Sequence, residues 1–167
     1  MNAPPSLNSP VEHIRSYHKE LTDIRRDFHA HPELGFTEVR TADIVAAKLE
    51  SWGIEVHRGI AKTGVVGVVK GRKSGSGRAV GLRADMDCLP MHENGNPPYK
   101  SENPGRMHAC GHDGHTTMLL GAGRYLAETR NFDGTAYLIF QPAEEGGGGG
   151  RVMVEEGLFE RFPANTV

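Results

Sequence analysis

The spacing of apolar residues predicts two helices in the first third of the chain. The first helix begins with a capping box formed by Ser9 and Glu12 and ends before Pro32. Its apolar face consists of Val11, Ile14, Leu21, Ile24 and Phe28. The second helix covers about residues 38–52 and is closed by Gly53. Its apolar stripe consists of Val39, Ala42, Val45, Leu49 and Trp52.

After Gly53 the pattern changes to short segments that are rich in β-branched residues and bounded by glycine, which predicts strands. These strands cover residues 54–57, 65–69 and 79–83. Residues 88–111 contain four prolines, and we expect them to form a long irregular loop of the kind that is often functional.

The second half of the chain predicts a helix over about residues 115–128 and a strand over residues 135–141. The strand is nearly all apolar after its first residue, which is typical of a strand covered on both faces. A strand, a crossover helix and a strand form a parallel α/β unit. Five glycines at positions 146–150 precede a short helix over residues 151–156. We therefore expect an α/β fold with a mostly parallel or mixed sheet covered by helices.

One domain over residues 9–167, preceded by a loose arm over residues 1–8, accounts for this pattern. The 19 Lys and Arg residues against 21 Asp and Glu residues give a net charge of -2, which argues against nucleic-acid and membrane partners. No apolar run approaches the roughly 20 residues that span a bilayer, and the start lacks the order of a secretory signal. The sequence therefore predicts a soluble, cytoplasmic protein.

Ligand-type side chains are concentrated in residues 108–115, which read HACGHDGH. Cys110 and His112 are two apart, so they point to different faces of a helix but to the same side of an extended loop, which Gly111 and Gly114 permit. Thiolate and imidazole together suit zinc and other divalent transition ions. The segment predicts a metal site, with a run of solvated histidines beside a buried cysteine as the alternative.

Two pairs of carboxylates also follow predicted strands. Glu144 and Glu145 follow the last strand, and Asp85 and Asp87 follow the third. Ligands of open α/β sheets bind beyond the carboxyl ends of the strands. One glutamate could bind a metal while the other faces water or substrate, and the aspartates could supply a ligand or orient a ligating histidine. An acidic surface turn is the alternative for the glutamates.

Three further residues have side chains capable of chemistry, but structural roles are favoured for them. His29 and His31 have a spacing found in metal sites, but Pro32 ends the first helix directly after them. Histidines commonly occupy such helix ends, so we favour a capping role for both. Cys88 is expected to be a small core or loop residue and not a nucleophile.

Four segments occur in the order 28–36 (FHAHPELGF), 81–87 (GLRADMD), 107–116 (MHACGHDGHT) and 140–147 (FQPAEEGG). Together they resemble the N-acyl-amino-acid amidohydrolases of the hippurate hydrolase and auxin-conjugate hydrolase type. The resemblance covers nearly the whole chain after the first arm. It implies a catalytic domain like those of metallo-aminopeptidases and carboxypeptidases.

The resemblance also implies roles for individual residues. Cys110, His112 and Glu145 match ligands of a centre that holds two divalent metal ions, such as Mn, Zn, Co or Ni. Glu144 matches the general acid/base, and Asp87 matches an aspartate at the mouth of the metal site, which makes it a second candidate catalytic residue. The implied reaction is hydrolysis of the amide that joins an acyl or aroyl group to an amino acid, with a small-molecule substrate.

The chain departs from the family pattern at two points. Aminoacylase and carboxypeptidase relatives carry a histidine ligand at the position of Asp85, so no ligand role is predicted for Asp85, and none for His115. Family members are more than twice as long, take further histidine ligands from segments that follow Val167, and carry a satellite domain often used for dimerisation. We expect this chain to be the N-terminal part of the catalytic domain, inactive alone, and the complete protein to be able to form a homodimer.

Two functions of other classes stay open at this point. In the first, Cys110 and His112 hold a structural ion in a non-catalytic metal-binding module. In the second, Cys110 is the nucleophile of a thiol hydrolase with His112 or His115 as its base. The second leaves Glu144 and Glu145 without a role, and a thiol enzyme should keep its activity after chelation.

Overall fold

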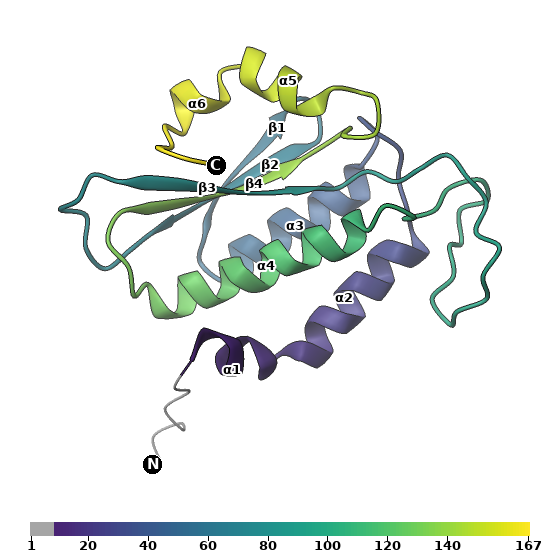
Figure 1. Ribbon diagram of the computed structural model, residues 1–167, viewed down its shortest axis with the longest axis horizontal. Coiled ribbons are helices and arrows are strands. Elements are labelled where there is room, and N and C mark those ends of the chain that lie inside the picture. Colours follow the sequence, from purple (N-terminus) through teal and green to yellow (C-terminus); the bar gives the residue numbers. More distant parts are fainter. Residues whose placement is uncertain (1–8) are drawn as a thin grey trace.

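A four-stranded sheet with the strand order β1-β2-β4-β3 forms the centre of the fold in a computed structural model, which describes residues 9–167 (Figure 1). The predicted arm over residues 1–8 lies outside the described residues. The strands are β1 (Glu55–Ile60), β2 (Gly64–Lys70), β3 (Ala79–Asp85) and β4 (Thr135–Gln141). β2 pairs antiparallel with both β1 and β4, whereas β3 and β4 are parallel. The predicted mixed sheet is therefore confirmed, as is the parallel unit formed by β3, a helix and β4.

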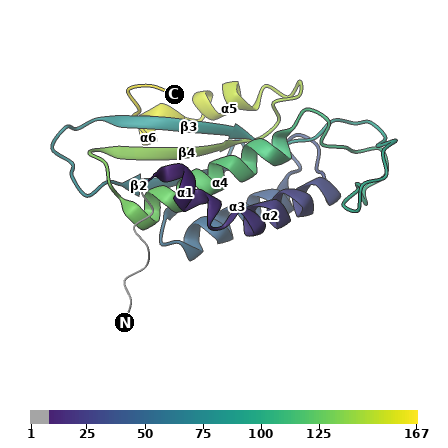
Figure 2. The ribbon, with the colours of Figure 1, turned by 60° about the horizontal axis from the view of Figure 1, so that its bottom comes forward.

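Helices cover both faces of this sheet. α3 (Val39–Ser51) and α4 (His112–Thr129) lie on one face, and α5 (Gly149–Glu155) and α6 (Leu158–Arg161) lie on the other (Figure 1). The N-terminal helices lie on the far side of α4 from the strands in Figure 1, and they come to the front in the turned view of Figure 2. No helix within residues 9–167 is long and apolar enough to cross a membrane.

Strand β4 contributes to two hydrophobic cores, one on each face of the sheet. Leu138 and Phe140 are fully buried in the larger core, together with Leu120 of α4. Ile139 points to the opposite face and packs in the smaller core with Met153 of α5. Successive side chains of a strand point to opposite faces, so an apolar run of this kind requires cover on both.

The predicted first helix is wrong as a single element, because it is broken into α1 (Pro10–Arg15) and α2 (His18–Ala30). Ser9 caps α1 as expected, since its Oγ accepts a hydrogen bond from the Glu12 N–H. The Ser16 hydroxyl donates to the His13 carbonyl at 2.7 Å, which offers the backbone a local alternative to helix. The break turns the ring of Tyr17 into the protein, where it is 6% exposed.

Two residues of the predicted apolar faces are exposed for related reasons. Val11 lies on the short helix α1, which buries no residue, and is 63% exposed. Val39 is the first residue of α3 and is 59% exposed, while Val45 and Leu49 of the same stripe are fully buried. The apolar spacing predicted the buried face of each helix correctly only where the helix packs on a neighbour.

The parallel strands β3 and β4 end side by side, with Asp85 opposite Gln141 in the register. α4 begins at the same edge, three residues earlier than predicted, because the N-cap Gly111 has a φ of 103° and the helix starts directly after it. The Thr116 hydroxyl of α4 donates to the Asp85 carbonyl at 2.8 Å. Gly114, which we expected in a loop, therefore lies in the first turn of α4. The same edge collects the polar segments that the sequence singled out.

Candidate metal centre

Three predicted ligands converge at this edge of the sheet. Cys110 precedes α4, His112 is its first residue, and Glu145 follows β4. One ligand atom from each, Sγ, a ring nitrogen and a carboxylate oxygen, lies within 4.8 Å of the other two. The convergence is therefore as predicted, and Gly111, with its left-handed backbone, supplies the turn that lets Cys110 and His112 face one point.

The polar atoms of this cluster are incompletely satisfied by the protein. Glu145 Oε1 is buried and accepts no hydrogen bond from the described residues. A buried carboxylate oxygen without a donor is costly unless a cation compensates it. The donor set of thiolate, imidazole and carboxylate is one that Zn²⁺ and related divalent ions accept. The residues present therefore fit a metal ion.

Asp87 connects the elements that carry these groups. Its carboxylate is fully buried and accepts hydrogen bonds from two backbone N–H groups, that of Glu144 at 3.0 Å and that of Glu145 at 2.9 Å. Its backbone carbonyl accepts a 2.8 Å hydrogen bond from Nδ1 of His112. Burial alone would raise the pKa of Asp87, but hydrogen bonds from His112 and from these backbone groups lower it. Asp87 thus stays ionised and fixes three groups of the cluster.

The hydrogen bond from Nδ1 leaves Nε2 of His112 free to face the cluster. Nε2 lies 3.8 Å from Glu145 Oε1 and 3.9 Å from Glu144 Oε2. A metal-bound histidine is usually oriented in this way, by a hydrogen bond from its other ring nitrogen. Burial opposes protonation of His112, but Asp87 and Asp85 outweigh it and raise the pKa of the ring.

Glu144 and Glu145 reach the same region with different exposure. The Glu144 side chain is 43% exposed and that of Glu145 is 23% exposed. The more exposed carboxylate can meet a substrate and bulk water, while the more buried one faces the thiol and the imidazole. The arrangement is compatible with the expected division between a proton-transferring glutamate and a ligating one.

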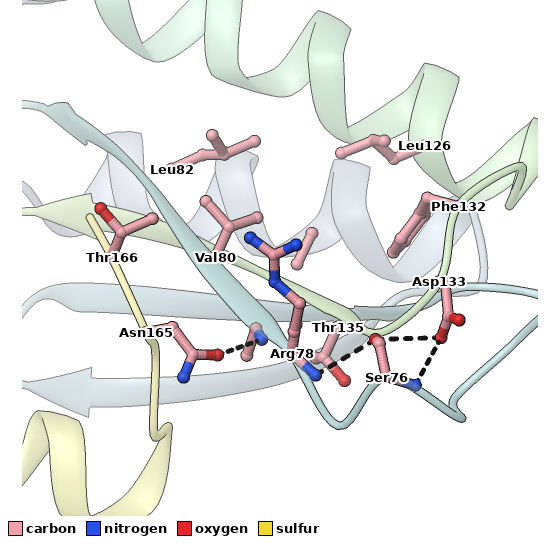
Figure 3. A pocket seen from close by; sticks show the side chains of 12 residues that line it. Ser76, Arg78, Val80, Leu82, Leu126, Phe132, Asp133, Thr135, Asn165 and Thr166 are labelled. Carbon is pink, nitrogen blue, oxygen red and sulfur yellow. Dashed lines mark hydrogen bonds between the residues drawn. The ribbon is translucent and has the colours of Figure 1, made fainter.

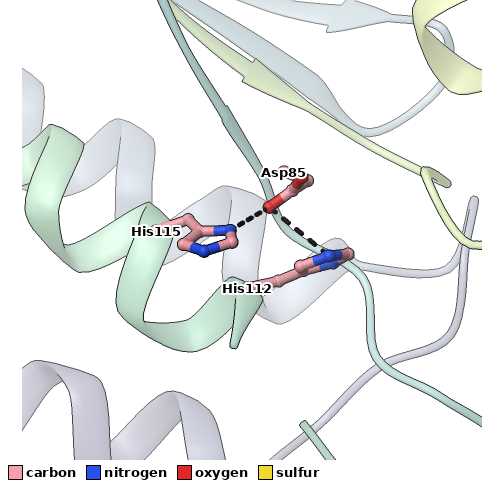
Figure 4. Close-up of side chains that lie close together, drawn as sticks. All are labelled: Asp85, His112 and His115. Atoms are coloured by element: carbon pink, nitrogen blue, oxygen red, sulfur yellow. Dashed lines mark hydrogen bonds and ion pairs between the residues drawn. The ribbon is translucent and has the colours of Figure 1, made fainter. Parts of the chain in front are cut away.

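A second group of side chains, which the sequence analysis did not assign, shares His112 with the first. Asp85 Oδ1 lies 2.8 Å from Nδ1 of His115 and 3.6 Å from Nε2 of His112 (Figure 4). Asp85 Oδ2 accepts a 2.8 Å hydrogen bond from the Arg83 guanidinium. His112 and His115 are three apart on α4, so they share a helix face. That spacing was visible in the sequence, but the predicted helix began too late to use it.

The residues that we set aside occupy three different environments. His31 is the C-cap of α2, and its Nδ1 donates to the Asp27 carbonyl at 2.8 Å, so its capping role is confirmed. His29 does not cap the helix; it is buried and faces Asp113. Cys88 is 3% exposed, and burial raises the pKa of its thiol to about 11, as expected for a core residue.

His108 of the ligand-rich segment is also buried, at 4% exposure. Neither ring nitrogen has a hydrogen-bond partner among the described residues, and burial lowers the pKa of the ring to about 4. The ring is therefore neutral near pH 7, and it lies 6.4 Å from the ring of His29.

A pocket of about 640 Å³ lies at the opposite end of β3 and β4, near the first residues of both strands (Figure 3). Apolar side chains such as Val80, Leu82 and Leu126 line it together with Arg78 and Asp133. None of its lining residues within 9–167 is a histidine, cysteine or glutamate. We therefore place the candidate chemistry at the metal-ligand cluster and not in this pocket.

Comparison with known proteins identifies relatives of this chain. The model of peptidase family M20/M25/M40 matches residues 81–167. Hippurate hydrolase of Campylobacter jejuni is 54% identical over 157 residues, which cover 94% of this chain and 40% of the relative. The IAA-amino acid hydrolase ILR1-like 4 of Arabidopsis thaliana is 51% identical over 147 residues, which cover 86% of this chain and 32% of the relative.

Solved structures show the same relationship. The YXEP protein of Bacillus subtilis, described as a dinuclear metal binding peptidase from the M20 family, superposes with a TM-score of 0.82 at 42% identity. The match covers 87% of this chain and 40% of that protein. The chain thus spans 32–40% of the length of these relatives. The predicted ligands lie within residues 81–167, the segment that the family model matches.

Proposed function

Because the chain belongs to peptidase family M20/M25/M40, we propose that its metal centre hydrolyses the amide bond of N-acyl or N-aroyl amino acids in the full-length protein. The products are a carboxylic acid and an amino acid. The observation that carries the proposal is the convergence of Cys110, His112 and Glu145 beside Glu144 at the ends of two parallel strands. The substrate class is supported by the names of the relatives, which act on hippurate and on IAA-amino acids.

In this proposal Cys110, His112 and Glu145 hold a divalent ion. The unpartnered Oε1 of Glu145 and the free Nε2 of His112 support it. Two ions per site, of Mn, Zn, Co or Ni, are proposed by analogy with the dinuclear relative. Bound ions of this kind would polarise the amide carbonyl and lower the pKa of a water molecule towards roughly 7.

Two residues of the protein have separate roles in this reaction: Glu144 transfers the proton, and Asp87 positions the glutamates. Glu144 takes a proton from the attacking water and delivers it to the nitrogen of the leaving amine. Its partial exposure lets the carboxylate reach both positions. Asp87 touches no solvent and contacts the backbone of both glutamates, so we assign it a positioning role in place of direct proton transfer.

The test is an assay of amino-acid release by the full-length protein, with N-benzoylglycine, N-acetyl amino acids and unblocked dipeptides as substrates. We expect release from the acylated substrates, loss of activity on chelation, and recovery on addition of Zn²⁺, Mn²⁺, Co²⁺ or Ni²⁺. Activity that survives chelation would favour the thiol hydrolase, with Cys110 as nucleophile. Tight metal binding without turnover would favour the non-catalytic metal-binding module.

A further inference from the structure

The loop over residues 88–111, which ends in the ligand segment, is fastened to the C-terminal end of α2. Three hydrogen bonds join the two segments: Glu102 N to Ala30 O at 2.7 Å, Asn103 Nδ2 to Pro32 O at 3.0 Å, and Cys88 N to Glu33 O at 2.9 Å. All three acceptors belong to the motif 28–36, which has no role in the proposed chemistry. The motif is therefore a support for the loop.

His29 lies at the centre of this contact and bridges two carboxylates. Its Nδ1 lies 2.8 Å from Asp113 Oδ2, and its Nε2 lies 3.2 Å from Glu93 Oε1. The Arg25 guanidinium lies 2.9 Å from the same oxygen of Asp113. The side chains of His29, Asp113 and Glu93 are 6%, 1% and 4% exposed. With Arg25, whose side chain is 35% exposed, these three buried groups form a quartet: Arg25, His29, Glu93 and Asp113.

The geometry fixes the hydrogen-bonding role of His29. An ionised carboxylate only accepts hydrogen bonds, so a ring nitrogen that pairs with one donates to it. Arg25 and His29 are both partners of the Asp113 carboxylate, and His29 also reaches the Glu93 carboxylate. Removing one member of a buried ionic group leaves the others uncompensated, which is strongly destabilising locally.

The ring of Tyr99 adds an aromatic contact to the same junction. The guanidinium groups of Arg25 and Arg26 lie 5.0 Å and 5.1 Å from its centroid, within the range of cation–π attraction. The ring of His29 meets it edge-on at 5.4 Å between centroids. These contacts hold Tyr99, at the middle of the loop, against α2.

Asp113 connects the quartet to the ligands. It follows His112 directly in the first turn of α4, and its second oxygen, Oδ1, accepts a 2.8 Å hydrogen bond from the Gly114 N–H. A shift of Asp113 therefore moves the backbone of His112. At the other side of His29, Glu93 accepts a 2.7 Å hydrogen bond from the Ser101 N–H and so braces the loop that leads to Cys110.

We propose that His29 is a positioning residue that clamps Asp113 and Glu93 together and thereby sets Cys110 and His112 at the spacing that a metal ion requires. This rests on the proposed function, because it assigns the ligand role to Cys110 and His112. His29 touches neither ligand and acts through the backbone. Outer partners of metal ligands typically change metal affinity by about 10- to 100-fold when they are removed.

The test is titration of the full-length protein with Co²⁺, followed through the thiolate-to-cobalt charge-transfer absorption that reports Cys110 in the coordination shell. His29→Ala and the near-isosteric Asp113→Asn should each weaken binding by about 10-fold or more and reduce this band. His31→Ala is the matched control, because it lies in the same motif and its side chain forms polar contacts with Asp27 and Glu102, which are outside the quartet. It should bind Co²⁺ within about twofold of the parent. Circular dichroism verifies the fold of each variant.

Each outcome decides one point. Unchanged affinity and an unchanged band in folded His29→Ala and Asp113→Asn would overturn the positioning role while leaving the proposed function intact. Equal losses in His31→Ala would also overturn it, since the motif would then act only on general stability. Absence of the thiolate band in the full-length parent protein would overturn the proposed function, and the inference with it. If His29→Ala does not fold, Asp113→Asn and the isosteric Glu93→Gln give the decision.

Discussion

Oε1 of Glu38 accepts a 2.8 Å hydrogen bond from the backbone N–H of Ala143, 105 residues further along the chain. Glu38 is fully buried, and its other oxygen accepts a 2.7 Å hydrogen bond from the Thr63 hydroxyl. Ala143 has a φ of 50°, a left-handed conformation that costs a residue other than glycine about 1–2 kcal/mol. The N-cap of α3 thus holds the strained turn from which Glu144 and Glu145 project.

The buried position of Glu38 predicts a pH-dependent stability. Burial raises the pKa of Glu38 above its ordinary value of 4.5, so the folded protein binds this proton more tightly than the unfolded chain does. The resulting stabilisation is complete below about pH 4.5 and is lost as the pH rises through the folded-state pKa. Glu38→Gln keeps an acceptor for Ala143 and a donor for Thr63 but does not titrate, so the variant should gain stability relative to the parent as the pH rises.

Urea unfolding of both proteins between pH 4.5 and pH 8, in the presence of a chelator, measures this difference. If the unfolding free energies of the two proteins change in parallel with pH, Glu38 has the same pKa in the folded and the unfolded state. Glu38→Ala is the control for the hydrogen bond itself. It leaves the Ala143 N–H buried without a partner and should cost about 1–3 kcal/mol at every pH.

Glu144→Gln should abolish turnover in the full-length protein and leave its metal content unchanged. A general base loses its function with its charge, whereas the ligands Cys110, His112 and Glu145 remain in place. The expected loss in kcat is about 10²- to 10⁴-fold. Parallel measurement of kcat and of bound metal checks this, and metal lost together with activity would instead make Glu144 a ligand.

The two cysteines should differ sharply in their effect on metal binding. Cys110→Ser removes the thiolate from the proposed ligand set and should weaken Zn²⁺ affinity beyond the about 10- to 100-fold typical of an outer partner. Cys88→Ser buries a hydroxyl in a site that is 3% exposed, so it should lower the unfolding free energy and leave the affinity of the folded protein unchanged. Calorimetric titration with Zn²⁺ and thermal unfolding in chelator separate the two effects. Equal affinities for Cys110→Ser and the parent would remove Cys110 from the ligand set.

The sequence predicted the parts of the fold that follow from local pattern. The strand over residues 135–141 has the same bounds as β4, because an apolar run between turn residues has few other solutions. The convergence of Cys110, His112 and Glu145 followed from the rule that parallel strands present their carboxyl ends at one edge. The break at Ser16 and Tyr17 was not predictable from periodicity, since it depends on burial of the Tyr17 ring against α4.

Long-range polar contacts were the main part of the site that sequence reasoning missed. Glu38 and His29 were an ordinary helix start and a presumed helix cap in the sequence, yet each meets a partner more than 80 residues away. Nothing in local pattern specifies which buried polar group satisfies which backbone donor. The contact between Asp85 and His115 was missed for a different reason: α4 begins directly after the αL residue Gly111, earlier than predicted, which places His115 on the helix.

The run of glycines at 146–150 was visible in the sequence, but which glycine is required depends on the packing. A Cβ at position 149 would lie 1.7 Å from the Pro142 carbonyl oxygen, so Gly149→Ala must displace the turn that leads to Glu144 and Glu145. We expect a loss of about 1–3 kcal/mol in unfolding free energy, as for other overpacked sites, together with weaker Zn²⁺ binding. Gly146→Ala is the matched control. Its φ is 85° with nothing within 4 Å of the added Cβ, so it should cost about 1–2 kcal/mol of backbone strain and leave Zn²⁺ affinity within about twofold. Urea unfolding and Zn²⁺ titration of both variants make the comparison, and equal metal affinity in the two would show that the approach of Gly149 to Pro142 does not set the position of Glu145.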